Sequence, residues 1–169
     1  MKVSPLILAG VAVLAVVALS SASGGVTNSD FNLSALNDTY GADNVNRLQN
    51  AINALGGQGL SDQKILFMAC QMLQETGLFT DNPNYNATDN DNNFAGISSG
   101  GSLKQYASLS DFANDYVRVL NLQPNVPIDA SSISDFNTRL KANGYYTDSA
   151  TTYGNNLNAY YNILTSTVS

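Results

Sequence analysis

The sequence has no histidine and no tryptophan, and it contains a single cysteine and a single glutamate. Without histidine there is no Ser-His-Asp or Cys-His catalytic pair and no His-ligated metal site. Cys70 is the lone cysteine, so no disulfide forms within the chain, and its neighbours Phe67, Met68 and Met72 predict a buried structural thiol. Any chemistry must therefore use carboxylates, hydroxyls and amides, and we expect no metal and no organic cofactor.

Charged residues are also scarce, at 12% of the chain, and the formal net charge is -6. The few lysines and arginines are scattered along the sequence. A nucleic-acid-binding surface needs clustered basic side chains, so we expect no nucleic acid as a partner. The polar residues are mainly Asn, Ser, Thr and Asp, a composition that suits contact with carbohydrate.

The N-terminal residues 3–24 carry no charge and consist largely of Leu, Ile, Val, Ala and Gly. One interpretation is a transmembrane anchor, with Lys2 inside and the rest of the protein outside the cytoplasm. The other is a signal peptide cut near Ser20 or Ser23, which would release the protein. We favour the anchor, which makes the membrane a partner through residues 3–24. Residues 25–42, rich in small polar residues, predict a linker, and residues 43–169 predict one domain.

Within residues 43–169 the apolar positions recur at helical spacing, so we expect a mainly α fold. Helices are predicted from about residue 43 to 55, 62 to 76, 111 to 120, 135 to 143 and 150 to 164. Ser61, Ser110 and Ser134 are the expected N-caps, and Gly77 is the expected end of the second helix. Residues 80–93 lack periodicity and predict a loop or a short hairpin.

Glu75 falls in the last turn of the second predicted helix, and every other acidic residue is aspartate. Apolar neighbours such as Phe67 and Phe79, together with the negative end of the helix dipole, should raise its pKa. Cleavage of a glycosidic bond needs one carboxyl that stays protonated near neutral pH. The second group would be a loop aspartate, such as Asp89 or Asp91, or a tyrosine. The alternative is that Glu75 simply suits a helix better than aspartate.

Four short motifs follow one another along the chain: residues 74–79 (QETGLF), residues 92–97 (NNFAGI), Tyr106 with the helix over 112–120, and residues 143–148 (NGYYTD). In this order they resemble the glucosaminidase family of bacterial autolysins and flagellar peptidoglycan hydrolases, the endo-β-N-acetylglucosaminidase-like domain. The resemblance covers roughly residues 45–164.

The resemblance implies a lysozyme-like helical domain with a short loop or β-hairpin lobe, preceded here by the N-terminal hydrophobic helix. It also implies cleavage of the β-1,4 bonds between N-acetylglucosamine and N-acetylmuramic acid in the peptidoglycan glycan strand. By this resemblance Glu75 is the catalytic acid, and Tyr145 is a second catalytic residue that orients substrate or water. The expected substrate-binding residues are Asn93, Phe94, Gly96, Asp89, Asp91 and Tyr106.

The chain departs from the family pattern in two places, because residues 149–152 intervene before Tyr153 and the loop between Glu75 and Asn92 is short. The second catalytic group is therefore open. Without a second carboxylate the enzyme would be a lytic transglycosylase. A third reading is a membrane-anchored structural protein of a virion or envelope that has a non-catalytic lysozyme-like fold. A virion-associated lysin would combine the enzymatic and structural roles.

Overall fold

The computed structural model describes residues 31–77 and 92–166. Within these ranges the fold is mainly helical, with six α-helices, two short 3-10 helices and one two-stranded ribbon. The expected mainly α class is confirmed. The predicted N-terminal anchor or signal peptide lies outside the described residues. No helix in the described ranges combines the length and the hydropathy that crossing a bilayer requires.

The helices follow one another along the chain with few strand residues between them. They are η1 (Leu33–Leu36), α1 (Asn37–Tyr40), α2 (Ala42–Gly56), α3 (Asp62–Thr76), α4 (Leu109–Leu122), η3 (Pro127–Asp129), α5 (Ile133–Ala142) and α6 (Ala150–Thr165). The strands β1 (Ser98–Ser99) and β2 (Ser102–Leu103) pair antiparallel, with Ser98 opposite Leu103. This ribbon precedes α4 and is the small β element of the fold.

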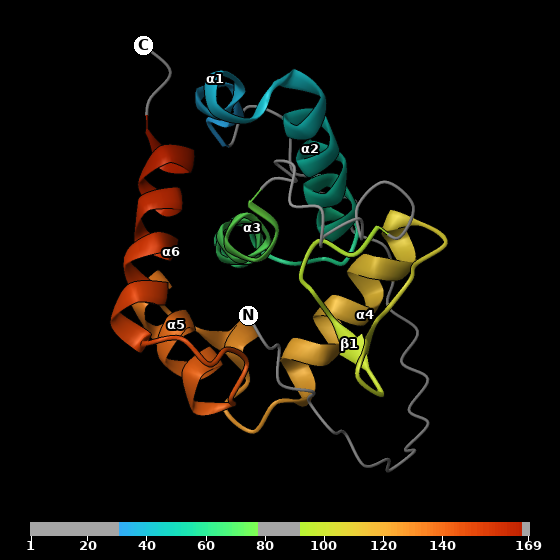
Figure 1. Ribbon diagram of the computed structural model, residues 1–169, viewed down its shortest axis with the longest axis vertical. Coiled ribbons are helices and arrows are strands. Elements are labelled where there is room, and N and C mark those ends of the chain that lie inside the picture. The colour runs from blue at the N-terminus through green and yellow to red at the C-terminus, as the bar shows by residue number, and fades with distance from the viewer. Residues whose placement is uncertain (1–30, 78–91, 167–169) are drawn as a thin grey trace.

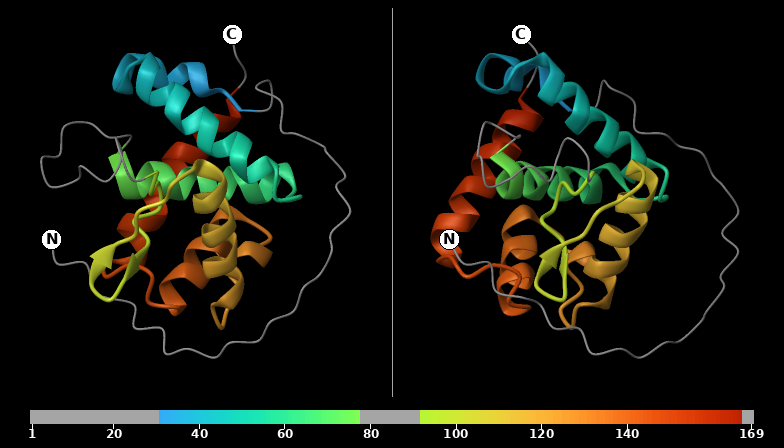
Figure 2. Two further views of the ribbon diagram at one scale, coloured as in Figure 1. Left: turned by 90° about the vertical axis from the view of Figure 1, so that its right-hand side faces the viewer. Right: turned by 45° about the vertical axis from the view of Figure 1, so that its right-hand side comes forward.

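The central element is α3, which Figure 1 shows end-on with α2, α4, α5 and α6 around it. The two views of Figure 2 show the same helix running across the middle of the molecule. Every residue from 65 to 73 is buried. A helix that is apolar and buried on all sides forms the core of a domain rather than one of its faces. The end of α3 is therefore a rigid place from which to present a side chain.

Aromatic rings fix α5 and α6 against this helix. The ring of Phe67 on α3 lies 5.9 Å from that of Phe136 on α5 and 6.2 Å from that of Tyr161 on α6, centroid to centroid. Tilted aromatic pairs at such distances add to the stabilisation from apolar burial. Helix α5 and the C-terminal part of α6 are thereby held against the first half of α3.

A second aromatic cluster attaches residues 92–106 to α4. The ring of Phe112 lies 5.7 Å from Phe94, 5.6 Å from Tyr106 and 5.4 Å from Tyr116, and all four side chains are buried. Because Phe112 is in the first turn of α4, it holds both ends of the segment that contains the ribbon. The NNFAGI motif is part of this packed segment.

The expected helix ends are partly right. Gly77 ends α3 in the left-handed conformation, at a φ of 56°, and its N–H binds the carbonyl of Leu73. Two of the expected N-caps are wrong, because α4 and α5 begin two residues earlier than Ser110 and Ser134 require. Their N-caps are Ser108 and Ser132, which accept hydrogen bonds from the backbone of residues 111 and 135. Ser61 does precede α3, but its side chain makes no capping bond.

The linker predicted for residues 25–42 is wrong from residue 31 onwards. Residues 33–40 form η1 and α1, and Phe31, Leu33 and Leu36 are buried in the core. The backbone N–H of Asn32 also donates to the carbonyl of Leu164 at the end of α6, over 2.9 Å. Three apolar side chains with this spacing supply enough burial to hold the segment on the domain.

Candidate active site

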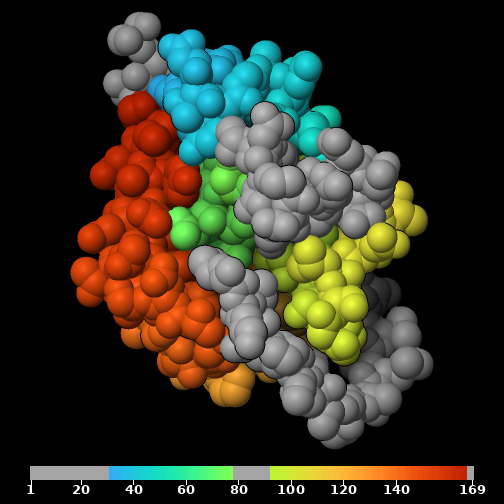
Figure 3. Space-filling model, in the orientation of Figure 1, coloured from blue at the N-terminus to red at the C-terminus, as the bar shows by residue number. Residues whose placement is uncertain are grey.

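Glu75 lies in the last turn of α3, where the helix reaches the molecular surface. In the space-filling view the light-green C-terminal end of α3 is visible beside α6 (Figure 3). The Glu75 side chain is half-buried. The next residue, Thr76, is buried and its hydroxyl donates to the carbonyl of Met72 over 2.6 Å. The helix thus stays regular through Glu75 and turns away directly after it, at Gly77.

The environment of Glu75 favours the neutral form of its carboxyl. Burial raises the pKa of Glu75 from its ordinary 4.5 to about 7, although a hydrogen bond from Tyr153 lowers it in part. Burial acts in this direction because it removes water from the charged form. Among the described residues no other carboxylate contributes to the pKa of Glu75. A carboxyl with this pKa can both donate and accept a proton at neutral pH.

Tyr153, in the first turn of α6, is the direct partner of this carboxyl. Its hydroxyl donates to Oε1 of Glu75 over 2.6 Å. Burial and the nearby charge of Glu75 raise the pKa of Tyr153 well above 10, so the phenol stays protonated and acts as a donor. The sequence pattern indicates only that residue 153 faces the core. Its role at the site was missed, because helical spacing does not show which polar group meets the tip of a buried side chain.

A buried polar pair lies nearby on α3 and α4. The hydroxyl of Tyr116 donates to Oε1 of Gln71 over 2.6 Å, and both side chains are fully buried. Burial, and then the charge of Glu75, raise the pKa of Tyr116, so this phenol is close enough to sense the carboxyl. Within the described ranges Nε2 of Gln71 has no hydrogen-bond partner. The buried Tyr116–Gln71 pair therefore places polar groups in the core close to the Glu75 carboxyl.

Tyr145, the second predicted catalytic residue, lies in the loop between α5 and α6 and is half-buried. Its hydroxyl donates to the carbonyl of Ala95 over 2.7 Å, which joins the NGYYTD and NNFAGI motifs. Its presence also raises the pKa of Tyr153, so these two phenols are neighbours. The structure therefore brings Glu75, Tyr153, Tyr145 and the 92–97 loop together. A catalytic role of Tyr145 stays a prediction.

Side chains of the NNFAGI motif make contacts within the protein. Nδ2 of Asn93 donates to the carbonyls of Ile97 and Lys104, at 2.8 and 3.0 Å, and its Oδ1 accepts from the N–H of Ile97 at 3.0 Å. Asn93 and Phe94 are buried, and Gly96 has a φ of 61°, which favours glycine. Asn93 thus closes the loop. Contact of these residues with a substrate stays a prediction.

Tyr106 is buried, and its hydroxyl donates to Oδ2 of Asp115 over 2.7 Å. The same carboxylate binds Nζ of Lys104 at 2.7 Å and Nη2 of Arg118 at 2.6 Å. These partners outweigh burial and hold the pKa of Asp115 below its usual range. The cluster attaches the ribbon to α4. A role of Tyr106 in substrate binding stays a prediction, as does that of Asp89 and Asp91, which lie outside the described residues.

No three acidic or cysteine side chains in the described ranges stand close enough together to hold a metal ion. Cys70 is buried, and burial raises the pKa of its thiol far above the usual range, which favours the inert thiol form. In the described part of the chain, the carboxyl of Glu75 is the acidic side chain whose pKa is raised towards neutral pH.

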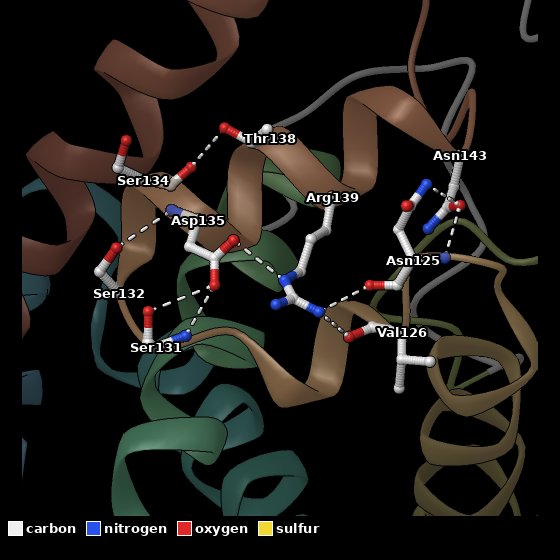
Figure 4. A network of polar contacts seen from close by, with 9 residues as sticks. All are labelled: Asn125, Val126, Ser131, Ser132, Ser134, Asp135, Thr138, Arg139 and Asn143. Carbon is white, nitrogen blue, oxygen red and sulfur yellow. Dashed lines mark hydrogen bonds and ion pairs between the residues drawn. The ribbon is translucent and has the colours of Figure 1, made fainter.

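An open depression of about 460 Å³ lies at the turn between α4 and α5, lined by Pro124, Asn125, Val126, Asp129, Asp135 and Arg139. Figure 4 shows how its polar groups are used. Nε of Arg139 binds Oδ1 of Asp135 at 3.0 Å, and its Nη1 donates to the carbonyls of Asn125 and Val126 at 2.9 and 3.3 Å. Asp129 binds Lys64 at 3.1 Å. These contacts stabilise a turn in which Val126 has a φ of 33°.

Comparison with family models, with curated proteins and with solved structures finds no match for this chain.

Proposed function

We propose that this protein cleaves the glycan strand of peptidoglycan, with Glu75 as the general acid. The observation that carries the proposal is a half-buried carboxyl at the end of the central helix whose pKa is about 7. An acid that protonates a glycosidic oxygen near neutral pH needs such a raised pKa. The order of the four motifs around Glu75 supports the substrate class, the β-1,4 bond between N-acetylglucosamine and N-acetylmuramic acid.

We also infer a lysozyme-like arrangement within the mainly α fold. Two features support it: the acid stands at the C-terminal end of the buried helix α3, and a short β-ribbon follows it in the chain. In this arrangement the helical part supplies the rigid acid, and the segment over residues 92–106 forms the other side of the site. The domain is proposed to act outside the cytoplasm, held by an anchor at residues 3–24 or secreted after its removal.

A second outcome of the same chemistry is lytic transglycosylation, which needs no second carboxylate. Within the described ranges its titratable neighbours are tyrosines rather than a second carboxylate. In the first step Glu75 gives its proton to the bridging oxygen as the glycosidic bond breaks. Its carboxylate then takes a proton from a hydroxyl of the same sugar as that oxygen bonds to the anomeric carbon, leaving an anhydro-sugar. If water attacks instead, the product is a reducing end.

The alternative from another class is a structural protein of a virion or envelope that uses this fold as a scaffold. The burial of Phe94 and Tyr106 and the full use of the Asn93 amide within the protein suit that role as well. The raised pKa of Glu75 is the observation that favours the enzyme, because a scaffold gains nothing from a destabilised carboxyl.

Zymography on purified peptidoglycan tests the proposal. Three full-length proteins are compared: the wild type, Glu75→Gln, and Asp38→Asn as a matched control that removes one charge from an exposed acid of α1. We expect clearing by the wild type and by Asp38→Asn, and none by Glu75→Gln. Equal clearing by all three rejects Glu75 as the acid. If the folded wild type clears nothing, the scaffold is the better account.

Mass analysis of the released fragments separates the two reactions. Fragments that end in an anhydro-sugar identify a transglycosylase, and fragments with a reducible end identify a hydrolase. Reduction with borohydride adds two hydrogens only to fragments with a reducible end. Comparing the fragment masses of one sample before and after reduction therefore distinguishes the hydrolase from the transglycosylase.

A further inference from the structure

Behind Glu75 the side chains of α5, α6 and the loop between them form a layered support for Tyr153. The first layer is Tyr153 itself, whose hydroxyl reaches Oε1 of Glu75 over 2.6 Å. The second layer is Tyr146, whose ring lies parallel to that of Tyr153, with centroids 3.7 Å apart and planes at 4°. The Tyr153 ring is buried, so its hydroxyl moves only as far as this stack allows.

The two tyrosine rings form a close parallel stack, which limits how far the Tyr153 ring can tilt. Further contacts hold Tyr146 in this position. The ammonium of Lys141 lies over the Tyr146 ring, 4.9 Å from its centroid, where the attraction between a cation and a π face is effective.

The third layer fixes Tyr146 from its other end. Its hydroxyl donates to Oδ1 of Asn137 over 2.6 Å, and Nδ2 of Asn137 donates to the carbonyl of Ala150 over 3.0 Å. Asn137 in turn lies directly against Gly154, where a Cβ atom would come within 2.6 Å of Nδ2. The glycine next to Tyr153 thus leaves room for the amide that holds Tyr146.

We propose that Tyr146, Asn137 and Lys141 are positioning residues that act through Tyr153 to occupy Oε1 of Glu75, so that the transferable proton of the acid resides on Oε2. A carboxyl oxygen that carries a proton is a poorer hydrogen-bond acceptor, so the oxygen that accepts from Tyr153 is the one left unprotonated. Fixing the phenol therefore selects the proton-bearing oxygen. Use of that proton on a sugar rests on the proposed function, whereas its placement is a property of the protein alone.

Among the described residues, the titratable groups that interact with this carboxyl are two phenols, Tyr153 from α6 and Tyr116 from α4. A third phenol, Tyr145 from the loop before α6, is a neighbour of Tyr153. Phenols remain neutral below about pH 10, so none of them changes charge while Glu75 titrates. A change in the titration of Glu75 in a variant can then be assigned to the altered hydrogen bond or burial.

Glu75 is the only glutamate of the chain, so its titration can be measured directly. The full chain is made with glutamate labelled by ¹³C at the side-chain carboxyl, and the single signal is followed by NMR from pH 4 to 9. Tyr153→Phe removes the donor, and the titration midpoint should rise by about one pH unit. Tyr146→Leu and Gly154→Ala leave the donor in place but release or displace its support, and both should raise the midpoint by a smaller amount.

Tyr160→Phe is the matched control, since it removes a hydroxyl from the same helix that lies 3.5 Å from Tyr40 and not at Glu75. Its midpoint should equal that of the wild type. The proposal is overturned if Tyr153→Phe raises the midpoint while the folded Tyr146→Leu protein titrates like the wild type, because Tyr153 then needs no support. Should Gly154→Ala not fold, Tyr146→Leu decides. If Tyr153→Phe and Tyr146→Leu both raise the titration midpoint of Glu75 while the wild type clears no peptidoglycan, the positioning role is retained and only the glycosidase activity is rejected.

Discussion

Replacing Glu75 by glutamine should change how the stability of the domain depends on pH. In the folded protein the pKa of Glu75 is about 7, against 4.5 as its ordinary value in an unfolded chain. Between these two values the folded state keeps a proton that the unfolded state has lost. The free energy of unfolding therefore falls as the pH rises from 4.5 to 7, and it stays lower above 7, where both states are ionised.

The size of this loss follows from the difference between the two pKa values. A difference of about 2.5 at 1.36 kcal/mol per pKa unit corresponds to about 3 kcal/mol. This is a large part of the 5 to 15 kcal/mol by which domains are typically stable. Glutamine is neutral at every pH and can still accept from Tyr153. At pH 8 the Glu75→Gln protein should therefore be more stable than the wild type by up to about 3 kcal/mol, and at pH 4 the two should be similar.

Urea unfolding followed by circular dichroism at pH 4, 5, 6, 7 and 8 measures the effect. Only the difference between the two proteins matters, because the remaining acids titrate alike in both. Asp38→Asn serves as the control for the loss of one exposed acidic charge. If the gap between Glu75→Gln and the wild type is the same at pH 4 and pH 8, the carboxyl is not held neutral by burial, and the argument for an acid catalyst fails.

Three further substitutions test the frame around the site. Asn93→Ala should lower the free energy of unfolding by about 2 to 4 kcal/mol, measured with urea, because it leaves buried loop carbonyls unpaired. Asp115→Asn should destabilise the protein at pH 7 but much less near pH 2, measured by thermal melts, because the depressed pKa of Asp115 contributes stability that is lost as the pH falls. Gly77→Ala should cost about 1 kcal/mol in urea unfolding, because its φ of 56° disfavours a Cβ.

Helices α2 to α6 were predictable because apolar spacing and glycine stops act locally, whereas η1 and α1 lie in the segment that was predicted as a linker. The two wrong N-caps had a readable signal as well. Ser108 and Ser132 each stand three residues before an aspartate, Asp111 and Asp135, whose backbone N–H binds the serine hydroxyl. This is the serine-x-x-acid pattern of a capping box, which a serine directly before the acid does not satisfy.

The site was predictable at Glu75 and not at its partner. A single glutamate in the last turn of an apolar helix indicates where the acid stands. Tyr153, in contrast, belongs to an apolar stripe of α6 like any core residue, and its contact with Glu75 depends on how two distant helices pack. Tyr145 was singled out by its motif, yet in the structure its hydroxyl meets a loop carbonyl. Pairing of this kind is decided by tertiary structure and leaves no local pattern.

The first and last turns of the described domain are fastened to each other. The backbone of Asn32 binds the carbonyl of Leu164, and its side chain binds Oγ of Ser166 over 2.9 Å. Tyr153 lies at the opposite end of α6, about 18 Å along the helix axis. A label, bead or fusion partner joined before Phe31 or after Ser166 would consequently emerge beside the C-terminal end of α6, away from Tyr153, so the protein can be immobilised through either end while Glu75 still faces a polymer.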